Sequence, residues 1–249
     1  MDLSRAPLHA AQSAPHLSRF LSVPPRPSPY LSPLTPQIAD QLQPALPRAT
    51  IVPNRIASVL ITAFKPYDTW SENSSWLALV ELAKDFPPGV EVTTRLYPVD
   101  FAEMKERLAE DMRPNYDVSL HLGQAPGEPT IRLERIGINI GAERDGPSLP
   151  LAEDGPEAFR SSLPLDEWAA KLIAEGIPAH VSHHAGTYLC NATLYWSHLL
   201  AERMSLQTRS AFLHLPLATS QVAASGEKLA SLPVEVTARA VRLILEELA

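Results

Sequence analysis

Strand-like and helix-like segments alternate along the chain from residue 56 onward, and this order constrains the fold more than any other feature of the sequence. Residues 58–63 form a continuous apolar run that is typical of a strand buried on both faces. Apolar residues at helical spacing follow it around Trp76. A strand expected at 179–182 and a helix expected at 191–204 repeat the pairing. The alternation predicts a three-layer α/β/α sandwich with a mainly parallel central sheet.

The segment before this alternation has a different composition. Eleven of the 25 prolines precede Asn54. Proline fixes the backbone angle φ and has no amide donor, so a segment this rich in proline cannot build regular helix or sheet for long. We expect an extended or disordered arm over residues 1–54 and a single α/β/α domain over residues 55–249.

Composition also limits which binding partners and which cellular compartment we expect. The formal net charge is −7, which argues against binding to nucleic acid or to an anionic membrane surface. No stretch approaches the roughly 18 consecutive apolar residues that a membrane-spanning helix needs. The start of the chain lacks the basic segment and apolar run of a secretory signal. With one cysteine and no partner for a disulfide, the sequence predicts a cytoplasmic protein.

That cysteine, Cys190, precedes the helix expected at 191–204. The N-terminus of a helix presents unpaired N–H groups and favours negative charge, so a thiolate at this position is stabilised as a nucleophile. The alternative interpretation is a small buried apolar residue, which is the usual role of an isolated cysteine.

A cysteine nucleophile needs a base within reach and a third group that orients the base. His214 ends an apolar strand and is the best candidate for the base, although a histidine at a strand end is often only structural. Glu134 interrupts an otherwise apolar alternating segment, where a carboxylate is costly to bury unless it is paired. It is the candidate orienting acid, and a salt bridge to Arg132 or Arg135 is the competing interpretation.

Other chemistries have weaker support in the sequence. His183 and His184 are adjacent and would point to opposite sides of an extended segment, without a recognised metal-ligand spacing. No phosphate-binding loop or glycine-rich nucleotide motif is present. We therefore expect no metal site.

Several segments together resemble the pyroglutamyl peptidase I family, the pyrrolidone carboxyl peptidases, which are cysteine peptidases that remove an N-terminal pyroglutamate. The matching segments are GQA at 123–125, ERIGIN at 134–139, AGTYLCN at 185–191, and AFLHLP at 211–216 with Gln221 beyond. They occur in the order and spacing of the family, and the resemblance runs from about Val59 to Gln221.

The resemblance implies roles for individual residues. Cys190 would be the nucleophile, His214 the general base and acid, and Glu134 the group that orients His214. Arg144 matches a family arginine near the site and would stabilise the oxyanion. The pocket for the pyroglutamyl ring would involve Phe64, Tyr67, Gln124, Tyr188 and Leu189. The resemblance further implies peptides with a blocked, pyroglutamyl N-terminus as substrates, no cofactor, and a homo-oligomer, either a dimer or a tetramer.

The chain departs from the family pattern around the expected pocket. Residues 63–70 read AFKPYDTW where the family has a glycine-rich loop, and this places Tyr67 where phenylalanine is usual. Glu128 stands in place of an arginine, and Asp145 in place of an apolar pocket residue. These changes leave two other hypotheses open. One is a cysteine hydrolase with a different small acyl or cyclic amide substrate, and the other is a non-catalytic ligand-binding protein.

Overall fold

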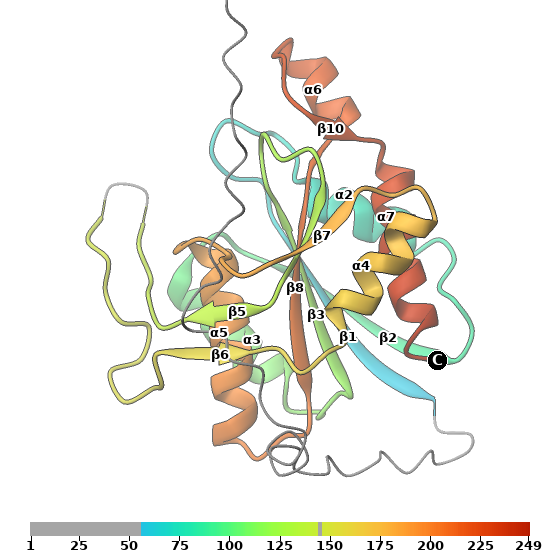
Figure 1. Cartoon of the computed structure of the whole chain (residues 1–249). Helices are drawn as coiled ribbons and strands as arrows, with labels where there is room; N and C mark the ends of the chain where they lie inside the picture. Colours follow the sequence, from blue (N-terminus) through green and yellow to red (C-terminus); the bar gives the residue numbers. More distant parts are fainter. Residues whose placement is uncertain (1–55, 144–145) are drawn as a thin grey trace, which may run out of the picture. The chain divides into compact units, whose positions relative to one another are not determined.

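The computed structural model describes residues 56–143 and 146–249 (Figure 1). The predicted arm over residues 1–54 lies outside the described residues, as do Arg144 and Asp145. Among the described residues, no helix is long and apolar enough to cross a membrane.

A six-stranded sheet forms the centre of the fold (Figure 1). Its strands, from one edge to the other, are β2 (Val90–Tyr97), β1 (Ala57–Phe64), β3 (Val118–Gln124), β8 (Arg209–Leu215), β4 (Ile131–Glu134) and β7 (Ala179–Ser182). Neighbouring strands pair in parallel except β4 and β8, which are antiparallel. The prediction of a mainly parallel sheet is confirmed.

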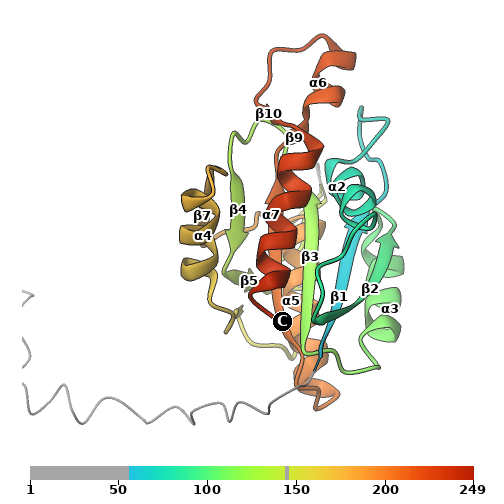
Figure 2. The ribbon, with the colours of Figure 1, turned by 90° about the vertical axis from the view of Figure 1, so that its right-hand side faces the viewer.

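Within the described residues, five helices cover the two faces of this sheet. On one face lie α2 (Ser74–Leu82), α4 (Leu165–Ala174) and α7 (Val234–Glu246), and on the other lie α3 (Phe101–Asp111) and α5 (Leu189–Arg203) (Figures 1 and 2). Strand β1 explains the layering, because its side chains alternate between the faces. Val59 and Ile61 belong to the core under α2, α4 and α7, whereas Leu60 and Phe64 belong to the core under α3 and α5. The three-layer sandwich is therefore confirmed.

Smaller elements lie outside the central sheet and form two separate two-stranded sheets. Strands β5 (Ile136–Ile138) and β6 (Ala158–Arg160) form an antiparallel pair, β9 (Leu217–Ala218) pairs with β10 (Ser231–Leu232), and α6 (Thr219–Ser225) lies between the latter two. The β-rich stretch from Ile131 to Ile140 is thus divided at Arg135 into strands of two different sheets. Pro216 similarly separates β8 from β9.

Candidate active site

Cys190 lies at the N-terminus of α5, as the sequence predicts, although the helix begins at Leu189, two residues earlier than expected, and so includes Cys190 in its first turn. The preceding loop contains Gly186 at φ +81°, a left-handed conformation that glycine adopts readily. Tyr188 is the N-cap of α5 in an extended conformation, and its side chain makes no capping hydrogen bond. The first N–H groups of a helix have no acceptor within that helix. The partly buried thiol is therefore held beside the positive end of the α5 dipole.

Asn191, the residue after the cysteine, fixes this end of α5 to the small β5–β6 sheet. The side chain of Asn191 is fully buried and accepts a hydrogen bond from the N–H of Ile138 at 2.9 Å. Its Nδ2 donates to the carbonyl oxygens of Ile138 at 2.9 Å and Ile140 at 2.8 Å. Three hydrogen bonds from one side chain thus define the position of the turn that carries Cys190.

His214 and Glu134 meet because β4 runs antiparallel to β8. In this register Glu134 lies opposite Phe212, two residues from His214, so the two side chains are diagonal neighbours. Glu134 Oε1 lies 2.7 Å from His214 Nδ1. Glu134 is fully buried and His214 nearly so. The structure therefore brings the predicted base and the predicted orienting acid together.

Arg132 contacts both members of this pair. The sequence suggested a salt bridge from Glu134 to Arg132 only as an alternative to the contact between Glu134 and His214. Arg132 Nε lies 3.2 Å from Glu134 Oε1, and its Nη2 lies 3.2 Å from His214 Nδ1. Its Nη1 donates to Glu128 at 2.9 Å. Glu134 thus has both of the partners that the sequence presented as competitors, and the other candidate, Arg135, instead forms an ion pair with Asp166.

The charges in this cluster shift the pKa values of His214 and Glu134. Burial acts to lower the pKa of His214, but the neighbouring Cys190 and Glu134 outweigh it and raise the pKa to about 9, through charge and hydrogen bonding. Burial likewise acts to raise the pKa of Glu134, and the hydrogen bond and charge of His214 outweigh it, so this pKa is lowered. The environment therefore favours an imidazolium at His214 beside a carboxylate at Glu134.

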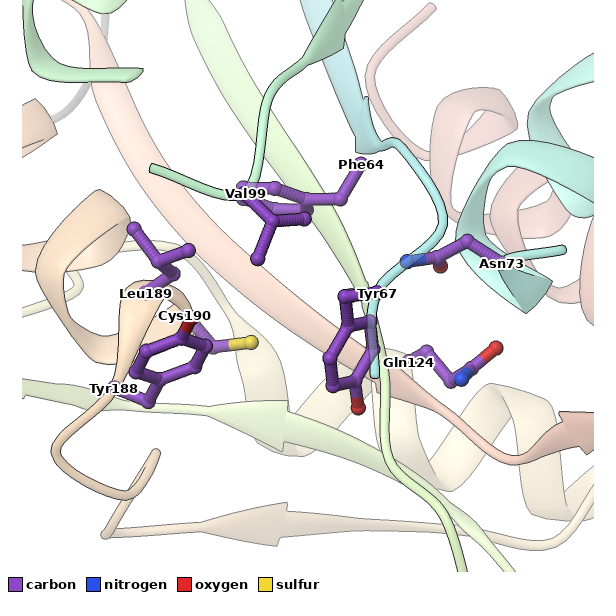
Figure 3. A pocket seen from close by; sticks show the side chains of 9 residues that line it. Phe64, Tyr67, Asn73, Val99, Gln124, Tyr188, Leu189 and Cys190 are labelled. Carbon is purple, nitrogen blue, oxygen red and sulfur yellow. The ribbon is translucent and has the colours of Figure 1, made fainter. Parts of the chain in front are cut away.

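An apolar pocket opens beside the thiol (Figure 3). All five residues expected to form the ring pocket line it, namely Phe64, Tyr67, Gln124, Tyr188 and Leu189. In Figure 3 the sulfur of Cys190 points into the space between the rings of Tyr188 and Tyr67. Asn73 and Val99 also line the pocket and were not expected there. From the sequence, Asn73 could be recognised only as a helix cap, and it does cap α2. Nothing in the sequence indicated Val99.

A second cavity, of about 410 Å³, adjoins the thiol on the side of His214. It shares Tyr67, Gln124, Tyr188 and Cys190 with the apolar pocket, and Glu128, Arg132 and residues 184–187 form much of the remaining wall. Cys190 therefore lies between an apolar pocket and a more polar cavity. Among the described residues, no cluster of three or more His, Cys, Asp or Glu side chains could hold a metal ion.

Comparison with known proteins gives this arrangement a family. The sequence model of the pyroglutamyl peptidase family matches residues 57–249. The chain belongs to the pyroglutamyl peptidase family. A pyrrolidone-carboxylate peptidase of Streptomyces coelicolor is 38% identical over 173 residues, which cover 66% of this chain and 80% of that protein. One of Halalkalibacterium halodurans is 34% identical over 198 residues, covering 76% of this chain and 98% of that protein.

Solved structures agree with this assignment to the pyroglutamyl peptidase family. The crystal structure of the pyrrolidone carboxyl peptidase from Fervidobacterium islandicum superimposes with a TM-score of 0.72 at 35% identity, covering 77% of this chain and 98% of that chain. The Pyrococcus furiosus structure gives a TM-score of 0.71 at 30% identity, covering 76% of this chain and 97% of that chain.

The departures from the family pattern have structural counterparts. Asp68 has φ +56° in the loop where the family resemblance predicts glycines, so this loop keeps a left-handed residue without glycine. Such a conformation is unfavourable for most side chains and is tolerated best by aspartate and asparagine. Glu128, in place of the family arginine, forms its ion pair with Arg132 at the rim of the second cavity. The reversed charge at position 128 is thereby balanced locally.

Proposed function

We propose that this protein hydrolyses the amide bond that follows an N-terminal pyroglutamyl residue, with Cys190 as the nucleophile, His214 as the general base and acid, and Glu134 as the orienting group. The observation that carries the proposal is the series Glu134–His214–Cys190 at the opening of an apolar pocket lined by the expected ring-binding residues. Membership of the pyroglutamyl peptidase family supports the same substrate.

The geometry supports a proton route through His214. Because His214 Nδ1 is held by Glu134, the other ring nitrogen, Nε2, is the one that exchanges a proton with Cys190. The raised pKa of His214 favours an imidazolium–thiolate pair before substrate binds. Glu134 stays ionised throughout and stabilises the imidazolium.

In the acylation step the Cys190 sulfur attacks the carbonyl carbon of the pyroglutamyl residue, and a C–S bond forms. The resulting oxyanion lies near the N–H groups that begin α5, which can donate hydrogen bonds to it. His214 then gives its proton to the departing nitrogen as the C–N bond breaks. Arg144, expected as a further oxyanion donor, lies outside the described residues and stays a prediction.

In the deacylation step a water molecule replaces the departed amine. His214 takes a proton from the water, the hydroxyl oxygen attacks the thioester carbonyl, and the C–S bond breaks to regenerate the thiolate. His214 lines the second cavity and does not line the apolar pocket, so we assign the second cavity to the leaving peptide and the attacking water.

The test is release of a fluorescent amine from a pyroglutamyl-amide reporter by the wild type and by Cys190→Ala. Turnover by the wild type and none by the variant is the expected result. A wild type that does not turn over but is rapidly labelled by iodoacetamide at Cys190 would indicate a cysteine hydrolase with another small acyl substrate. No turnover and slow labelling would favour a non-catalytic ligand-binding protein. Homo-oligomer formation and a cytoplasmic location stay predictions.

A further inference from the structure

The carboxamide of Gln124 forms a polar wall of the apolar pocket, and its orientation is determined from outside that pocket. Gln124 is 5% exposed. Its Oε1 accepts hydrogen bonds from the backbone N–H of Ser74 and from Nε2 of Gln221, both at 2.8 Å. A backbone N–H can only donate, so the atom that faces Ser74 must be the oxygen. The oxygen of Gln124 lies on the side away from Tyr67 and Cys190 in Figure 3.

The amide nitrogen of Gln124 is left without a partner. Nε2 is buried and has no acceptor within the described part of the chain. A buried N–H donor that makes no hydrogen bond costs free energy, which a ligand regains if it brings an acceptor to that point. A residue that lines the pocket therefore carries a buried donor without an acceptor.

Gln221 is itself fixed by two backbone groups. Its Oε1 accepts a hydrogen bond from the N–H of Ala218 at 2.8 Å, the return contact of a capping box at the start of α6. Its Nε2 donates to the carbonyl oxygen of Glu72 at 3.0 Å as well as to Gln124. Reversing the Gln221 amide would set donor against donor at Ala218 and acceptor against acceptor at Glu72. Neither Gln221 nor Gln124 can therefore turn over without losing these bonds.

We propose that Gln221 is a positioning residue that acts through Gln124. It holds the Gln124 carboxamide with the NH₂ group toward the ring pocket, and so the pocket selects a five-membered ring that carries a carbonyl oxygen over one that has a methylene group there. This inference rests on the proposed function, because it takes the bound ring to be a lactam. Gln221 does not line the ring pocket, so its effect on the substrate is indirect.

Gln221→Glu is the informative substitution. The glutamate keeps an oxygen for the N–H of Ala218 but turns a second oxygen toward Gln124 Oε1, where the two acceptors repel. Gln124 can then keep its hydrogen bond from Ser74 only against this repulsion, or rotate its NH₂ group toward position 221 and away from the pocket at the cost of that bond. Either way the orientation that faces the pocket loses stability. Gln207→Glu makes the same chemical change on an exposed loop and is the matched control. Gln221→Met, which removes both polar atoms at similar length, is the second variant if Gln221→Glu does not fold.

The experiment measures lactam binding separately from turnover. 2-Pyrrolidone, the smallest five-membered lactam, should protect Cys190 from alkylation by iodoacetamide in a saturable way, which yields a dissociation constant. We expect Gln221→Glu to raise this constant about tenfold, the factor that corresponds to about 1.4 kcal/mol, and Gln207→Glu to leave it unchanged. With the pyroglutamyl reporter, KM should rise by a similar factor while kcat changes little, because the lost hydrogen bond serves substrate and transition state alike.

The outcomes separate this inference from the proposed function. A purely structural role for Gln221 would reduce the fraction of active enzyme and hence kcat, leaving the dissociation constant of 2-pyrrolidone unchanged, and that result overturns the inference. Failure of 2-pyrrolidone to protect the wild type overturns it too. If the wild type binds 2-pyrrolidone, Gln221→Glu loses that binding, and neither hydrolyses the reporter, then the proposed activity fails while the positioning role of Gln221 stands.

Discussion

A buried histidine that stays neutral in the folded state makes the stability of this protein sensitive to acid. His121 lies on β3 and is fully buried. Thr62 Oγ1 lies 2.8 Å from its Nδ1, and Ser119 Oγ lies 3.2 Å from its Nε2, so both ring nitrogens have hydroxyl partners in the neutral form. Burial, with a smaller contribution from His198, lowers the pKa of His121 to about 3. In the unfolded chain it returns to about 6.5.

The sign and size of the effect follow from this difference. Below pH 6.5 the unfolded chain binds a proton at His121 that the folded protein does not, so the contribution to stability is fully present above pH 6.5 and is lost as pH falls. At pH 5, which is about 1.5 units lower, the loss amounts to about 2 kcal/mol at roughly 1.4 kcal/mol per unit. Substituting His121→Gln removes the titration and keeps a group that can hydrogen-bond to Thr62.

The assay is urea unfolding followed by tryptophan fluorescence at pH 8, 7, 6 and 5. Between pH 8 and pH 5 the wild type should lose about 2 kcal/mol more stability than His121→Gln. The raised pKa of His214 gives a contribution of opposite sign, present below pH 6.5 and lost as pH rises through about 9, but it is common to both proteins and cancels. His180→Gln, on the exposed side of β7, is the control. An equal pH dependence in wild type and His121→Gln would refute the reasoning.

Two further substitutions test the active-site geometry. Because Glu134 helps to raise the pKa of His214 to about 9, Glu134→Gln should lower kcat on the order of 10²-fold or more and move the alkaline limb of the kcat/KM profile to lower pH. A limb that does not move would contradict the assigned pair. A methyl group added by Gly123→Ala would lie 2.5 Å from Phe212 Cζ and 3.1 Å from Cys190 Sγ. We expect a loss of about 1–3 kcal/mol in urea unfolding together with a fall in kcat/KM, whereas unchanged values of both would show that the site adapts.

Most of the layered fold could be predicted because its signals are local. The apolar run that becomes β1 and the helical spacing that becomes α5 each reflect burial of one segment, and burial pattern is readable from sequence. The position of Cys190 in the first turn of α5 follows from the same pattern. Very short elements such as β9 and α6 have too few residues for a periodic signal, and neither was predicted.

The contacts between distant segments were not predictable from local pattern. The alternation in β4 is the same whichever way the strand runs, so nothing local indicates that it pairs antiparallel with β8. That pairing sets Glu134 diagonally opposite His214, a contact that the chemistry of the two residues and the family resemblance suggested but that no strand pattern indicated. The orientation of Gln124 likewise depends on Gln221, which is 97 residues away in the chain. The dual partnership of Glu134 with His214 and Arg132 could not be resolved from sequence either.

The most direct test of the central claim is to identify the covalent intermediate on Cys190. The wild type would be mixed with excess pyroglutamyl-amide reporter, quenched in acid within the first turnovers, and analysed by intact-mass spectrometry and peptide mapping. The proposed mechanism predicts a mass increase of one pyroglutamyl group on the peptide that contains Cys190, and neither adduct nor turnover in Cys190→Ala. Turnover that persists in Cys190→Ala, or an adduct on another residue, would contradict the assignment of Cys190 as the nucleophile.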